Sequence, residues 1–189
     1  MKKTRTVFKL LAILALLCFF PAPSQAQEAR LSDIVLTNTR DHLLVYFAVE
    51  GCFTPEMEQA IENGIQTTFT FYIRLYEEKE WAWDRKIIDL EINHTVKYDN
   101  IKKVYTIRLA EQGDRTLTVR DWDKAKKLMA EVVALKVIPL KQLQKGRQYK
   151  LKMMAQLDRI KLPLYLHHLL FFLSLWDFET DWHEIDFQY

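Results

Sequence analysis

Three acidic side chains and a histidine alternate near the end of the chain. Asp177, Glu179, Asp181 and His183 occupy every second position, so they project from one face if the backbone there is extended. Three carboxylates and an imidazole on one face could ligate a divalent cation. Sites for hard cations normally fold a glycine-containing loop around the ion, and this segment has no glycine. We therefore favour a solvated strand face, and we expect no resident metal or cofactor. The alternative is a protein, possibly an enzyme, that binds a small ligand or a metal at this acidic face.

Other patterns of catalytic chemistry are not found in the sequence. His167 and His168 are adjacent, so they lack the spacing of four that places two imidazoles on one helical face. His94 lies in an alternating segment, where we expect the sheet to satisfy it. The sequence contains no Gly-x-Ser-x-Gly elbow and no glycine-rich phosphate loop. These observations favour a protein that is not an enzyme, and no catalytic residue is predicted.

The most apolar run outside the N-terminus covers residues 162–176. Its 15 residues fall short of the roughly 20 that a transmembrane helix needs. An apolar run of this kind must be covered, either by the sheet of its own domain or by a partner or membrane interface. Both alternatives remain open from sequence. The residues that we expect to carry an interaction are Leu164, Leu166, Phe171, Phe172, Trp176 and Trp182.

The first 26 residues have the organisation of an export signal. Four basic residues and no acid precede an apolar run from Leu10 to Phe20, and Ser24-Gln25-Ala26 offers small residues for cleavage. We predict cleavage after Ala26 and a periplasmic protein, with membrane association left open. A lipoprotein signal at Cys18 is the less favoured alternative, because a bulky leucine precedes that cysteine. An uncleaved anchor is a further alternative.

Removal of this segment changes the charge. The full chain of 189 residues has 27 basic and 25 acidic residues, but four of the basic ones lie in the export signal, so the remainder carries a formal charge of −2. A chain of this charge has no footprint for nucleic acid. Cys52 is then the sole thiol, and its apolar surroundings predict a small buried side chain. We expect one domain over residues 27–189.

Period-two alternation dominates this domain. Strands are predicted over 43–49, with apolar residues on both faces, over 65–76, over 133–140 and over 149–157, and a hairpin is predicted over 86–109. Pro139 indicates that the strand over 133–140 is an edge strand or ends there. Short helices are predicted over 54–64, capped by Thr54, and from Asp121 to Val132. Helices so few and so short cannot supply the crossovers of a parallel sheet. The expected fold is α+β and mainly antiparallel β, sandwich-like, with two short helices and an apolar C-terminal segment.

Several of these features together resemble one family. The exported N-terminus, the early apolar strand pair, the Pro–Leu run at 162–164, the segment WDFETDW at 176–182 and the aromatic end are similar to bacterial exported proteins known as domain of unknown function 4390. The resemblance implies a cell-envelope protein without an assigned activity or catalytic residue. Genes of this family often lie near that of a membrane-bound nitrogen-regulation sensor kinase. This implies an envelope protein partner, with a membrane-bound sensor as one candidate.

Overall fold

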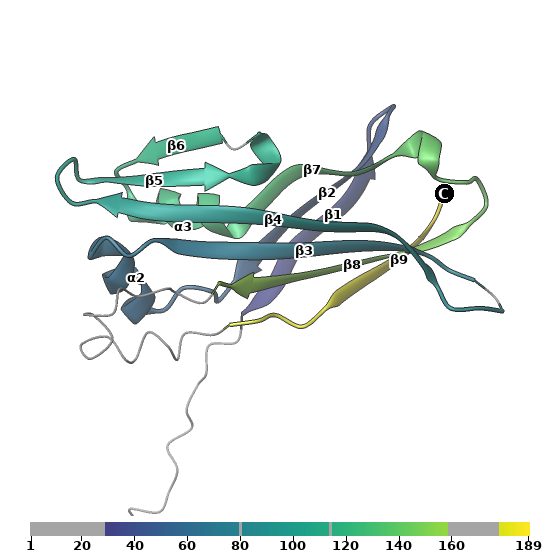
Figure 1. Ribbon diagram of the computed structural model, residues 1–189, viewed down its shortest axis with the longest axis horizontal. Helices are drawn as coiled ribbons and strands as arrows, with labels where there is room; N and C mark the ends of the chain where they lie inside the picture. The colour runs from purple at the N-terminus through teal and green to yellow at the C-terminus, as the bar shows by residue number, and fades with distance from the viewer. Residues whose placement is uncertain (1–28, 80, 114, 159–177) are drawn as a thin grey trace, which may run out of the picture.

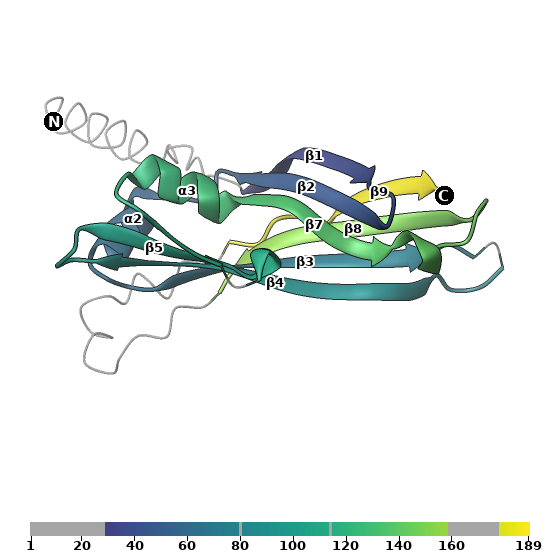
Figure 2. The ribbon, with the colours of Figure 1, turned by 90° about the horizontal axis from the view of Figure 1, so that it is seen from above.

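Two antiparallel sheets pack face to face in the computed structural model, which describes residues 29–79, 81–113, 115–158 and 178–189 (Figure 1). The smaller sheet has the order β1-β2-β7, and these strands cover Arg30–Asn38, His42–Glu50 and Glu131–Pro139. The larger sheet has the order β6-β5-β4-β3-β8-β9. Its strands, in chain order from β3 to β6 and then β8 and β9, cover Thr67–Glu77, Arg85–Asp99, Val104–Leu109, Arg115–Val119, Gln148–Leu157 and His183–Gln188. Figure 2 shows the smaller sheet lying over one face of the larger one. The predicted fold class is confirmed.

The core lies between the sheets and follows the predicted alternation. In β3 the side chains of Phe69, Phe71 and Ile73 are fully buried, whereas Arg74 and Tyr76 on the other face are partly exposed. Phe71 meets Phe47 of β2 edge to face, with ring centroids 5.6 Å apart. The large sheet therefore has one face buried in the core and one face towards solvent, as a half-buried strand pattern predicts.

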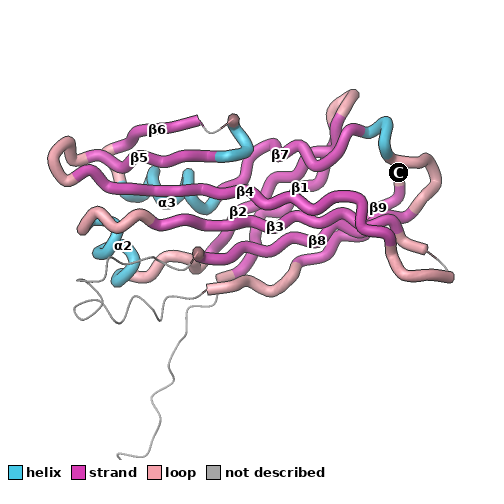
Figure 3. Tube along the Cα trace, in the orientation of Figure 1, coloured by secondary structure: helices cyan, strands magenta, loops and turns pink. Residues whose placement is uncertain are grey.

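Two short helices lie at one end of the molecule (Figure 3). Helix α2 covers Pro55–Glu62, with the Thr54 hydroxyl accepting the Met57 N–H at 3.3 Å, and Gly64 follows it at φ +86°. Helix α3 covers Trp122–Ala130 and lies over β4 and β5. Both predicted helix starts are confirmed. No helix among the described residues has the length and apolar character that a bilayer crossing requires.

Several details differ from the prediction. Strands β1 and β6 were not predicted, and β9 covers His183–Gln188, further along the chain than the strand face expected over 177–183. Val132 belongs to β7 and not to the second helix, because α3 ends at Ala130 and Glu131 is already extended. The outer face of β2 is only partly covered: Leu44 is buried, but Tyr46 and Ala48 are partly exposed.

Candidate functional site

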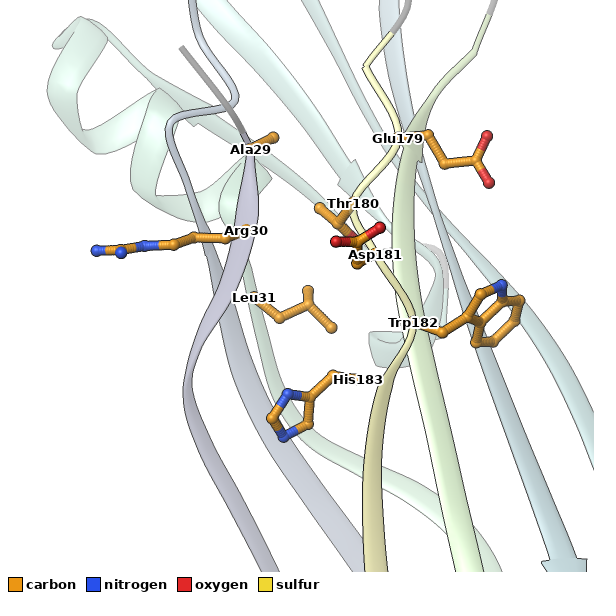
Figure 4. Close-up of a pocket in the computed structure, with 8 residues that line it drawn as sticks. All are labelled: Ala29, Arg30, Leu31, Glu179, Thr180, Asp181, Trp182 and His183. Atoms are coloured by element: carbon orange, nitrogen blue, oxygen red, sulfur yellow. The ribbon is translucent and has the colours of Figure 1, made fainter. Parts of the chain in front are cut away.

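A groove separates the edge of the small sheet from the edge of the large one. Ala29, Arg30 and Leu31, at the start of β1, form one side, and the segment 179–183, which leads into β9, forms the other (Figure 4). Its volume is about 410 Å³. Both β1 and β9 are edge strands, so each has backbone N–H and C=O groups on the side away from its sheet partner.

Thr180 fixes one wall of this groove. The Thr180 side chain is 3% exposed, its hydroxyl accepts the Ala155 N–H at 3.0 Å, and its own N–H donates to the Ala155 carbonyl at 2.9 Å. Next to it, the Phe178 carbonyl accepts the Leu157 N–H at 3.0 Å, and the Phe178 ring packs edge to face on Phe69. These contacts hold the start of the last segment firmly against the end of β8.

The predicted acidic face is only partly described. Asp177 lies outside the described residues, and Glu179 forms an isolated bridge with Gln156. Figure 4 shows Glu179 on the side of the strand away from β1, whereas His183 points towards β1. Across the described part of the chain, no group of three or more His, Cys, Asp or Glu side chains is arranged to hold a metal ion.

Trp182 is the one predicted interaction residue that the structure describes. Its partly buried ring lies under the Arg74 guanidinium, 4.6 Å from the ring centroid, and Arg74 Nε donates to Asp89 at 3.0 Å. Trp182 therefore belongs to the outer face of the large sheet, next to the groove. The other five, Leu164, Leu166, Phe171, Phe172 and Trp176, lie outside the described residues.

Paired charges cover β8 and β9 on this outer face. Lys152 donates to Glu184 at 2.5 Å, and this hydrogen bond lowers the pKa of the Glu184 carboxyl. Lys150 lies 3.1 Å from Glu78, whose hydrogen bond raises the pKa of that lysine. A surface of neutralised pairs positions its side chains but leaves little net charge to attract a charged ligand.

Two groups with chemical potential are buried away from this groove. Cys52 is 3% exposed, and burial raises the pKa of its thiol to about 12. A buried thiol with a raised pKa is unreactive, which agrees with the small buried side chain predicted from the sequence. His94 is fully buried: its Nδ1 lies 3.1 Å from the Met129 carbonyl and its Nε2 lies 2.8 Å from the Glu111 carboxylate. His94 is satisfied, but not by the sheet as expected: its partners are the Met129 carbonyl of α3 and the Glu111 carboxylate of the turn after β5. The His94–Glu111 pair ties the short turn Ala110–Gln112 to β4 and α3.

Sequence reasoning missed two tryptophans in the connection between β3 and β4. Trp81 and Trp83 are each 96% exposed. The signal was present as a Trp-Ala-Trp run inside a charged segment that has neither strand nor helix periodicity. Such a run does not by itself show whether the two rings are buried or exposed, because that depends on how the turn packs in the folded protein.

One protein family matches nearly all of the described chain. The model of "Domain of unknown function (DUF4390)" matches residues 26–186. The chain belongs to this family. The DUF4390 match therefore includes both sides of the groove and the tryptophan-bearing connection, and it confirms the family predicted from the sequence. Comparisons with curated proteins and with solved structures find no match.

Proposed function

We propose that this DUF4390 protein is a non-enzymatic interaction domain of the bacterial cell envelope. It binds its partner at the end of the sandwich where β8 connects to β9. The observation that carries this proposal is the length of that connection. Strands β8 and β9 are antiparallel neighbours, and Leu157 is already hydrogen-bonded to Phe178. About two to five residues close a hairpin of this kind, yet the chain places twenty there, residues 158–177, including its most apolar run outside the N-terminus.

The location in the envelope rests on the N-terminal segment. Its basic start, apolar run and small residues before position 27 have the order of an export signal. The family match begins at residue 26, which is where this signal is proposed to end. The one cysteine that remains after removal of this signal, Cys52, is buried. A buried thiol suits an oxidising compartment, because it is protected from forming unwanted disulfides.

The groove beside this connection favours a protein partner over a lipid surface. The edge strands β1 and β9 offer backbone hydrogen bonds to an extended segment of another chain. The groove lining also includes Arg30, Asp181 and His183, which are polar or charged and exposed. Such a lining suits a peptide with mixed polarity, such as a segment of a membrane-bound sensor in the envelope.

Replacing residues 160–176 tests the proposal. A four-residue Gly-Ser linker keeps every hydrogen bond that holds Phe178 and Thr180 to β8, so the sandwich is expected to stay folded. A second variant carries a Gly-Ser linker of the original length, which separates the effect of sequence from that of length. Crosslinking in intact cells is expected to capture a partner with the natural chain and with neither variant.

Two outcomes contradict the proposal. If both variants melt at much lower temperature than the natural chain, residues 160–176 belong to the core and are not a docking element. If both variants fold and still capture the same partner, binding does not use this connection. Flotation of the natural chain with lipid vesicles distinguishes the lipid alternative, because binding to vesicles that is lost in both variants identifies the membrane as the partner at this end.

A further inference from the structure

The connection between β3 and β4 presents two large apolar side chains to solvent. Trp81 and Trp83 are both 96% exposed, although tryptophan normally buries most of its large apolar surface. The connection projects from one end of the molecule, whereas the groove between the starts of β1 and β9 lies about midway along it (Figure 1). Two indoles on one projecting turn therefore have a role that the packing of the domain does not explain.

The base of this turn is held in place by ion pairs. The Glu77 carboxylate is 2% exposed and accepts Lys79 Nζ at 2.8 Å and Arg85 Nη2 at 2.5 Å. The Glu78 N–H donates to the Gln148 carbonyl at 3.0 Å, which ties the turn to β8. The Lys79 N–H also donates to Asp84 across the turn. The two tryptophans are thus carried on a supported base.

A basic turn lies beside the tryptophans. Trp81 and Ala82 line the same hollow as Gly146 and Arg147. The segment 140–148 that contains this turn carries three basic residues and no acid. These residues are Lys141, Lys145 and Arg147, and all three are exposed. Arg147 Nε lies 3.9 Å from the Glu77 carboxylate, and Glu78 and Asp84 line the same hollow. Lys141 and Lys145 are therefore the residues that offer positive charge at this end of the sandwich.

We propose that this end is an anchor for an anionic lipid surface. Indole rings prefer the boundary between headgroups and acyl chains, where the ring is apolar and its N–H stays hydrated. Basic side chains at the same level attract anionic headgroups. Trp81 and Trp83 enter this boundary, and Lys141 and Lys145 lie against the headgroups.

Other occupants fit this end less well. The aromatic centre of a protein interface is normally set in a wider apolar patch. The hollow beside Trp81 has no second large apolar side chain: apart from the small Ala82 and Gly146, its other residues are charged or polar, namely Glu78, Lys79, Asp84, Arg147 and Gln148. A small ligand would be enclosed by its aromatic contacts, but both indoles stand free of the surrounding chain. The lipid surface is therefore the occupant that we commit to.

Vesicle binding tests the anchor. The full chain is expressed so that the host processes it, and the purified product is mixed with phosphatidylcholine vesicles or with vesicles that also contain phosphatidylglycerol. The natural protein is expected to float with the anionic vesicles, and a Trp81→Ser/Trp83→Ser variant is expected to bind them about tenfold more weakly. A Lys141→Gln/Lys145→Gln variant should lose the preference for anionic lipid, and added salt should weaken the natural protein in the same way.

Ile101→Ser is the matched control. Ile101 is 94% exposed in the turn between β4 and β5, at the other end of the molecule. This change therefore removes an apolar side chain that is as fully exposed as each tryptophan, and it leaves the anchor intact. All these substitutions are at exposed positions, and unchanged melting temperatures would show that they act on binding alone. Equal binding by the natural chain and the double tryptophan variant would overturn the anchor, and so would failure of the natural chain to bind either vesicle.

The anchor and the proposed function fail separately. The variants that replace residues 160–176 keep both tryptophans, so they should still bind anionic vesicles even where they lose their partner. If those variants lose vesicle binding while the double tryptophan variant retains it, the lipid contact lies at the β8–β9 connection and the anchor is wrong. Loss of a crosslinked protein in the tryptophan variant, with vesicle binding unchanged, would instead identify a protein as the occupant of this turn and overturn the lipid assignment.

Discussion

Removing one partner of the buried contact between His94 and Glu111 is expected to destabilise the protein more than removing one partner of a surface ion pair. Burial on its own would raise the pKa of the Glu111 carboxyl, but the hydrogen bond and charge of His94 outweigh it and lower that pKa. Glu111→Ala leaves His94 Nε2 buried without its acceptor, and we expect a loss of about 3 kcal/mol in the free energy of unfolding. Urea denaturation at neutral pH measures this loss.

Two variants sharpen that measurement. Glu111→Gln keeps an oxygen that can accept from His94, so it should lose less than the alanine variant. Arg30→Ala removes an exposed pair with Glu50 at 2.8 Å, and it should change the unfolding curve little because solvent screens that pair. Equal losses in the alanine variants at positions 111 and 30 would show that the buried pair has no special weight.

Single residues differed in how well the sequence predicted them. The burial of Cys52 was predicted correctly because it follows from an apolar neighbourhood, which is local information. The partners of His94 were not predictable, because Glu111 and Met129 reach it only after the chain has folded back. Trp81 and Trp83 were missed because exposure of an aromatic residue is a property of the tertiary structure.

Among the elements, those with regular alternation or clear caps were predicted and the others were not. Strand β1 has a register shift between Ser32 and Val35, with Asp33 at φ +50°, so its inward residues break the period of two. Strand β6 is a five-residue edge strand with only Leu117 and Val119 as apolar residues. Val132 continued the spacing of the second helix although the backbone had already become extended. Irregular strands therefore need their pairing partner to be recognised.

The cap of α3 tests how much a local signal contributes. Asp121 Oδ1 accepts the Lys124 N–H at 2.8 Å at the start of the helix. Asp121→Ala should cost about 1 kcal/mol of stability, and Asp121→Ser should recover most of it, since serine caps equally well. Asp123→Ala, two residues after the cap, is the control. It removes the surface ion pair between Asp123 and Lys126 and should cost about 0.3 kcal/mol. Thermal unfolding compares the three, and equal effects at 121 and 123 would contradict a capping role.

On the scale of the whole molecule, two separate places on the sandwich have different chemistry. The groove lies about midway along the molecule, beside the starts of β1 and β9, whereas the tryptophan-bearing turn and its basic neighbour lie at one end. The sequence predicted two layers of antiparallel strands, because alternation and short helices leave few other folds. It could not predict which turns share an end, since that depends on the strand order of each sheet. A partner at one place and a lipid surface at the other would allow the protein to connect the two.

Acid should destabilise the whole molecule, because carboxylates with lowered pKa values occur in both sheets. Folding places basic groups or backbone N–H donors beside these carboxylates, which stabilises their charged forms. The carboxylates concerned are Glu50, Glu77, Asp89, Asp99, Glu111 and Glu184. A carboxyl whose folded pKa is below its ordinary value, 4.5 for Glu and 3.8 for Asp, contributes stability that is present above that value and is lost as the pH falls through the folded pKa. The free energy of unfolding should therefore be nearly constant from neutral pH to about 5 and fall steadily below it.

Glu77→Gln tests the sign of this dependence. Hydrogen bonds from Lys79 and then Arg85 lower the pKa of the Glu77 carboxyl, so glutamine removes both the stabilising charge and its titration. The variant should be less stable than the natural protein at neutral pH, and the two unfolding curves should converge as the pH falls through the lowered folded pKa of Glu77, below which both side chains are uncharged. Urea titrations at several pH values measure this convergence. A difference that stays constant at every pH would show that Glu77 stabilises the base of the turn through packing and not through its charge.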